Sequence, residues 1–228
     1  DKHIAQKNLY KGIGIKSVDI KPMPSPMYLS NVDCVACHIT KKKSSELEDT
    51  DFEGSVKGCD KCHPAQYAKT TENAKKTINK TLSLVKAKMM DMEKKIGSKE
   101  ITKIGDIRHD LFIIERGHGV HNVYFSAQIL RKTNEVLDDI AKKNSITVSD
   151  LRENELIQGS FCATMCHEKI GIKVPKKEVF YKNKKMPHEA HWKDAQIACS
   201  NCHEFLEHKN VKLKINKELC KTCHENGM

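Results

Sequence analysis

The chain has 228 residues and a formal net charge of +10, with ten cysteines but only 38% hydrophobic and 5% aromatic residues. This length suits one compact domain or two small ones, yet it offers little apolar material for a core of that size. The composition therefore indicates that something other than side chains fills part of the interior. No run of about 18 or more apolar residues occurs, so no transmembrane segment is expected.

Residues 1–64 are the first of three blocks along the chain. The block opens at Asp1-Lys2-His3 with neither an initiator methionine nor an apolar signal region, so we expect a mature, exported chain whose signal has been removed. The proline-rich stretch Lys21–Met27 predicts extended backbone rather than helix. Two cysteine motifs follow, Cys34-Val-Ala-Cys37-His38 and Cys59-Asp-Lys-Cys62-His63.

Residues 65–150 contain no cysteine and are predicted to be helical throughout. Two apolar stripes alternate steps of four and three residues, separated by Gly97-Ser98, which predicts a central antiparallel helical hairpin. The first stripe consists of Ile78, Leu82, Val85, Met89, Met92 and Ile96. The second consists of Ile104, Ile107, Leu111, Ile114, His118, His121 and Phe125. Two histidines at successive seam positions are not explained by packing alone.

Residues 151–228 carry three further motifs. They are Cys162-Ala-Thr-Met-Cys166-His167, Cys199-Ser-Asn-Cys202-His203 and Cys220-Lys-Thr-Cys223-His224. The segments between the five motifs do not resemble one another, so no repeat array is predicted. These segments are short and lysine-rich, and little strand is expected in them.

The grouping of the cysteines decides between disulfides, zinc and haem. All ten fall into pairs, and a histidine directly follows each pair, which neither disulfide frameworks nor zinc sites require. C-x-x-C-H is the attachment motif of c-type haem, in which two thioethers hold the porphyrin and the histidine binds the iron. The third motif has one extra residue; a looser turn would absorb it, and a disulfide or an unrelated Cys–His pair is its alternative.

We therefore expect five covalently bound haem c groups. The predicted fold is mainly α with much irregular structure, built around a haem stack, and the three blocks form one compact haem-bound unit. The predicted attachment residues are Cys34, Cys37, Cys59, Cys62, Cys162, Cys166, Cys199, Cys202, Cys220 and Cys223. The predicted proximal iron ligands are His38, His63, His167, His203 and His224.

Seven histidines remain for five sixth-ligand positions, which favours bis-histidine ligation. His109 is the least favoured, because it faces away from the helix seam. Methionine ligation by Met23, Met27, Met165 or Met186 is the alternative and would raise the reduction potential. The predicted sixth ligands are His118, His121, His188, His191, His208 and the near-terminal His3.

Two stretches resemble known families. The five motifs, with Met186-Pro187-His188-Glu189-Ala190-His191 ahead of the fourth, resemble class III-type multihaem cytochromes c. The stretch from Arg116 to Asn122, followed by Tyr124, resembles the long helices of the pentahaem nitrite reductase and octahaem hydroxylamine oxidoreductase superfamily. The resemblance implies a shared haem-packing scaffold. Because no cysteine pair here is followed by lysine, it implies electron transfer rather than catalysis.

The expected function is electron relay through closely packed bis-histidine haems in a respiratory or extracellular chain, not enzymatic catalysis. The alternatives are a protomer of an extracellular cytochrome filament and a small multihaem reductase of nitrogen or sulfur compounds. Other redox proteins or further copies of the chain are the expected partners. Nucleic acid is not expected, since haem propionates offset the positive charge. Covalent haem attachment implies a periplasmic or extracellular location.

Overall fold

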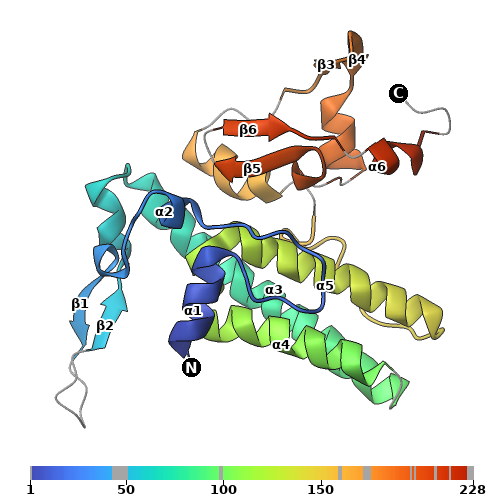
Figure 1. The fold of residues 1–228 in the computed structure, drawn as a ribbon, viewed down its shortest axis with the longest axis horizontal. Coiled ribbons are helices and arrows are strands. Elements are labelled where there is room, and N and C mark those ends of the chain that lie inside the picture. The colour runs from blue at the N-terminus through green and yellow to red at the C-terminus, as the bar shows by residue number, and fades with distance from the viewer. Residues whose placement is uncertain are drawn as a thin grey trace.

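The computed structural model describes residues 2–42, 51–97, 100–158, 161–171, 176–195, 197, 199–207, 210–215 and 217–224. The fold is mainly helical, as predicted (Figure 1). The helices are α1 (Lys2–Lys11), α2 (Pro26–Leu29), α3 (Gln66–Ile96), α4 (Ile101–Gly117), α5 (Val123–Lys143) and α6 (Lys217–Lys221).

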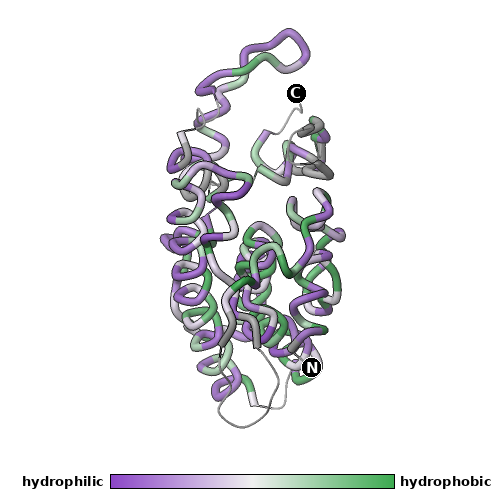
Figure 2. Tube along the Cα trace, turned by 90° about the vertical axis from the view of Figure 1, so that its left-hand side faces the viewer, coloured by the Kyte–Doolittle hydropathy of each residue, from purple (hydrophilic) through white to green (hydrophobic). Residues whose placement is uncertain are grey.

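Three long helices, α3, α4 and α5, pack on one another and contain most of the hydrophobic core. The predicted stripe of α3, from Ile78 to Ile96, is buried at all six positions. In Figure 2, hydrophobic and hydrophilic segments alternate along the helices, as expected for helices with one buried face. Gly97 has a φ of 66°, a left-handed conformation that suits glycine, and it ends α3 where the sequence predicted a break.

The second predicted helix is two helices rather than one. Helix α4 ends at Gly117, residues Gly119–Asn122 form a 3-10 turn (η3), and α5 begins at Val123. His118 has a φ of 50°, which an α-helix does not allow. The Asn122 side chain accepts a hydrogen bond of 3.1 Å from Phe125 N and thereby starts a new helix. His118 and His121 therefore lie in a turn and not on a helix seam, and the block contains three long helices instead of two.

The N-terminal segment is attached to these helices by buried polar contacts. The Asp110 carboxylate accepts hydrogen bonds from Lys16 N (2.9 Å), Ser17 N (2.7 Å) and Ser17 Oγ (2.6 Å). Asn122 Nδ2 donates to Met23 O at 2.7 Å. The extended backbone predicted for residues 21–27 is correct as far as residue 25. Pro26 is the first residue of α2, where the missing amide proton is no loss.

The structure contains more strand than expected. In the described part of the chain, three two-stranded antiparallel sheets pair β1 with β2, β3 with β4 and β5 with β6. Each of these pairs is a local hairpin, and such pairs form without the long apolar alternation that would have revealed them in the sequence. The strands are β1 (His38–Lys42), β2 (Asp51–Gly54), β3 (Val179–Tyr181), β4 (Lys184–Met186), β5 (His203–Glu207) and β6 (Asn210–Leu213).

The C-terminal part lies beside the helical group and differs from it in burial (Figure 1). Within the described part of the chain, no residue after Ala163 is buried. The residues described in this segment therefore add no buried side chains to the hydrophobic core. No helix among the described residues has the length and apolar character needed to cross a membrane.

Candidate functional site

A cavity of about 2550 Å³ runs from α1 and the β1–β2 hairpin to the C-terminal segment. Sites for one small molecule usually measure about 300–1,000 Å³, so this cavity has room for several bulky groups. Eight of the predicted attachment residues line it: Cys34, Cys37, Cys59, Cys62, Cys199, Cys202, Cys220 and Cys223. Ten histidines also line it: His3, His38, His63, His118, His121, His167, His188, His191, His203 and His224.

The other predicted residues are placed as follows. His208 lies outside the described residues, and nothing is described of the side chains of Cys162 and Cys166. His109 is described but does not line the cavity, because its Nδ1 lies 3.0 Å from Asp110 Oδ1 in the anchor of the N-terminal segment.

The ring of His38, from the first motif, faces the ring of His121. Their centroids are 6.2 Å apart, and their planes differ by 7°. An imidazole nitrogen binds a metal at about 2.0–2.1 Å and lies roughly 1.1 Å from its ring centre, so two trans imidazoles have centroids about 6.2–6.4 Å apart. The His38–His121 separation therefore fits one metal ion held between the two rings.

Two further ring pairs have the same separation. His203, of the fourth motif, lies 6.2 Å from His188, and His224, of the fifth motif, lies 6.1 Å from His191. The interplanar angles are 77° and 28°. Rotation of a ring about the metal–nitrogen axis changes this angle without changing the centroid distance, so the separations of both pairs leave room for one metal ion between the rings. Each of these three pairs joins one motif histidine to one histidine predicted as a sixth ligand. The rings of His118 and His121 also lie 6.4 Å apart, at an angle of 42°, so the separation alone does not define a ligand pair.

Backbone carbonyls orient the second histidine of each pair. Nδ1 lies 2.7 Å from Gly117 O in His121, 3.0 Å from Lys176 O in His188 and 2.8 Å from Pro187 O in His191. A carbonyl oxygen only accepts, so Nδ1 carries the proton and Nε2 has the lone pair. This is the arrangement that metal-binding histidines commonly have. The sequence contained no signal for these carbonyl partners.

The motifs themselves form tight turns that place a thiol pair beside the following histidine. In the first motif, Cys37 N donates to Cys34 O at 3.2 Å, and His38 begins β1. The third motif, with its extra residue, forms a π-helix from Cys162 to His167 (η4). A π-turn is wider than an α-turn and accommodates one more residue, and such turns frequently mark functional sites.

The thiols of neighbouring motifs lie close enough to influence one another. Burial raises the pKa of the Cys59 thiol, and the neighbouring Cys37 raises it further. Burial likewise raises the pKa of Cys202, with a further contribution from Cys220. Cys34, Cys37, Cys59 and Cys62 do not form disulfides.

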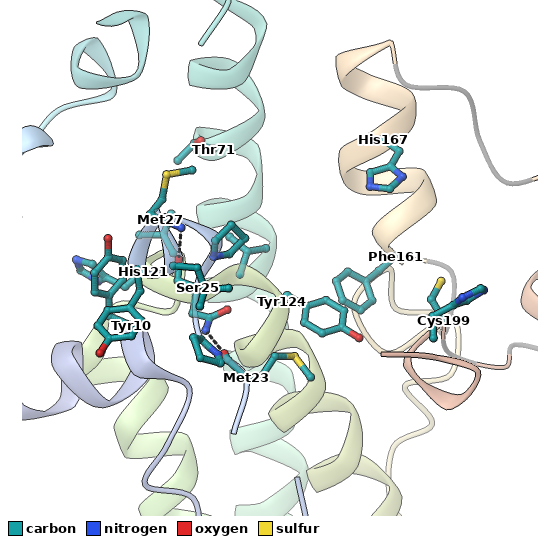
Figure 3. A pocket seen from close by; sticks show the side chains of 18 of the residues that line it. Tyr10, Met23, Ser25, Met27, Thr71, His121, Tyr124, Phe161, His167 and Cys199 are labelled. Carbon is teal, nitrogen blue, oxygen red and sulfur yellow. Dashed lines mark hydrogen bonds between the residues drawn. The ribbon is translucent and has the colours of Figure 1, made fainter. Parts of the chain in front are cut away.

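Aromatic side chains lie in or next to the lining of the cavity. Tyr124 and Phe161 stack with ring centroids 5.7 Å apart, between His121 on one side and His167 on the other (Figure 3). Tyr67 stacks on His63 at 4.5 Å. A flat, largely apolar macrocycle fits this lining better than a strongly hydrated ligand does.

Comparison with protein-family models, with curated proteins and with solved structures gives no match to this chain. Within the described ranges, no group of three or more His, Cys, Asp or Glu side chains converges as in a protein-only metal centre. The arrangement consists of histidine pairs with cysteine pairs beside them.

Proposed function

We propose that this protein is a pentahaem c-type cytochrome that transfers electrons. The observation that carries the proposal is the set of three ring pairs at 6.1–6.2 Å, each joining a motif histidine to a second histidine across one cavity. A disulfide framework would not require such pairs, and a tetrahedral zinc site would not separate two rings as trans ligands.

In this proposal the ten motif cysteines would form the thioethers and the five motif histidines would bind the irons. The haem irons supply one-electron oxidation and reduction at potentials set by their axial ligands. The chain would orient the sixth ligands through backbone carbonyls, and α1, α3 and the C-terminal hairpins line the cavity that would hold the haems. Burial lowers the pKa of His203, and His188 lowers it further, which favours the neutral form that ligates metal.

The ring pairs favour electron transfer over catalysis. In each pair this chain would supply both axial ligands, so these three irons would have no position for a substrate. Bis-histidine ligation lacks the thioether that raises potentials, so low reduction potentials are expected. We infer a periplasmic or extracellular location, where covalently attached haem is matured, and other redox proteins as partners.

Intact mass after denaturation tests the cofactor directly. Five haem additions are expected, and four would point to the third motif as the error. The reduced protein is expected to bind little carbon monoxide. Stoichiometric binding to one haem would instead favour a reductase. No haem addition at all in protein matured in an exporting host would overturn the proposal.

The His191→Ala variant tests the ring pairs. We expect it to keep all five haems while one iron in five becomes high-spin, because the thioethers remain and one sixth ligand is lost. His109→Ala is the matched control, since His109 does not line the cavity, and it should leave every haem low-spin. Electron paramagnetic resonance with spin counting measures both. An unchanged low-spin spectrum in His191→Ala would contradict the assignment of this pair.

A further inference from the structure

Two segments of the chain fold in the same way around their cysteine motifs. We call residues 34–63 the first hairpin unit and residues 199–224 the second hairpin unit. In each unit, a motif ends on a histidine that begins a strand, a second strand returns antiparallel, and the next motif follows. The first unit contains β1 and β2, and the second contains β5 and β6.

The hydrogen bonds of the two units correspond. The residue after the returning strand donates to the second cysteine of the first motif: Ser55 N to Cys37 O and Lys214 N to Cys202 O, both at 2.8 Å.

The next motif closes with the same bond in each unit. The motif histidine donates its amide to the first cysteine of its own motif, His63 N to Cys59 O and His224 N to Cys220 O, again at 2.8 Å. The two units therefore share one architecture that their sequences do not reveal.

Each unit also faces a pair of histidines spaced three residues apart. His121 pairs with His38 of the first unit, and His118 precedes His121 by three residues and has its ring 6.4 Å from that of His121. His188 and His191 pair with two histidines of the second unit. The later histidine of each pair bonds through Nδ1 to the carbonyl four residues earlier, Gly117 for His121 and Pro187 for His191. In the second unit both histidines of the pair have a ring partner, His203 for His188 and His224 for His191.

We propose, on the basis of the function proposed above, that each H-x-x-H pair supplies the sixth ligands of both haems of one hairpin unit. His121 already pairs with His38 in the first unit. The equivalence therefore assigns His118 as the sixth ligand of the haem attached at Cys59, Cys62 and His63. The two units differ in which motif the later histidine of the pair serves. His121 pairs with the first motif of its unit, whereas His191 pairs with the second motif of its unit.

Packing fixes the backbone on both sides of His118, whose own side chain is exposed in the absence of any bound group. A Cβ on Gly117 would lie 2.6 Å from Leu9 Cδ1, and a Cβ on Gly119 would lie 2.7 Å from Ile78 Cγ2, so both flanking residues are held tightly against α1 and α3. His118 itself has a φ of 50° and lines the same cavity as His63. Non-glycine residues with such backbone angles persist where the surroundings impose them, often at functional sites.

The haem of the third motif then lies outside both units. Its histidine, His167, is on η4, which packs against α3, and lies beyond Phe161 in the view of Figure 3. The chain would thus hold two equivalent haem pairs and one additional haem.

A combination of variants tests the assignment of His118. In the five-haem protein, His118→Ala should turn one iron high-spin. In a background that carries Cys59→Ala and Cys62→Ala, and four haems by mass, His118→Ala should add no high-spin signal, since its haem is already absent. His121→Ala is the matched control and should add one high-spin iron in both backgrounds. A new high-spin iron from His118→Ala in the four-haem background, or none in the five-haem protein, would overturn the assignment.

A milder background covers the case in which the four-haem protein does not fold. Cys59→Ala alone leaves one thioether and one vinyl group conjugated with the porphyrin, which moves the absorption of that haem to longer wavelength. Adding His118→Ala should convert the shifted band, and no other band, to a high-spin spectrum. Conversion of an unshifted band would assign His118 to another haem. The proposed function would survive that result, because the intact mass would still show five haems.

Discussion

Replacing Asp110 by alanine is expected to detach the N-terminal segment from the helical group. Asp110 is fully buried on α4, and its carboxylate accepts three hydrogen bonds from Lys16 and Ser17. A buried donor left without an acceptor costs about 1–3 kcal/mol. Ser17 is almost fully buried, whereas Lys16 is exposed and its amide can be hydrated, so we expect a loss near the lower end of the summed range, about 3–5 kcal/mol.

This loss is large beside the total of about 5–15 kcal/mol typical of native proteins. Urea denaturation of the haem-loaded protein, followed by far-ultraviolet circular dichroism, measures it. Asp106→Ala, one turn earlier on α4 and only partly buried, is the matched control and should change the free energy of unfolding by less than about 0.5 kcal/mol. A loss below about 1 kcal/mol for Asp110→Ala would show that water replaces the carboxylate and that the segment is held by other contacts.

Two substitutions in the helical group have separate expected outcomes, both measured by the same denaturation. Gly119→Ala should destabilise the protein by about 1–3 kcal/mol, because the new Cβ would lie 2.7 Å from Ile78 Cγ2; an unchanged midpoint would mean that the η3 turn shifts freely. Lys88→Met should cost about 1–3 kcal/mol, because the buried Asn134 loses the donor that lies 2.8 Å from its Oδ1, while the half-exposed Asp138 is solvated. A gain in stability for Lys88→Met would show that apolar packing outweighs that hydrogen bond.

The parts of the fold that the sequence predicted are those governed by burial at a regular period. The stripe from Ile78 to Ile96 is buried throughout α3, because every one of its residues faces the same neighbours. The break at His118 was not predicted, because His118 and His121 continue the spacing of the second stripe. The tight packing of Gly117 and Gly119, which requires the turn, is visible only in three dimensions.

The sequence predicted the residues of the candidate site more completely than it predicted the surrounding fold. Residue chemistry alone selected the motif cysteines and histidines, and those that the structure describes line one cavity. The sequence did not predict which histidine rings lie together, because the pairs join residues as distant in the chain as His38 and His121. The equivalence of the two hairpin units was also missed. It lies in backbone bonds such as Ser55 N to Cys37 O and Lys214 N to Cys202 O, which side-chain identities do not encode.

The absence of buried residues after Ala163, among those that the structure describes, has a consequence for how the cell handles incomplete copies of this protein. The helical group has its own core and can fold as soon as that part of the chain is free. The described residues after Ala163 have no such core, so under the proposed function a copy without C-terminal haems would carry a folded body with a protease-sensitive tail. Proteases would then remove the C-terminal segment from copies that lack these haems and leave the haem-loaded copies intact. Chain length alone would therefore distinguish the two forms.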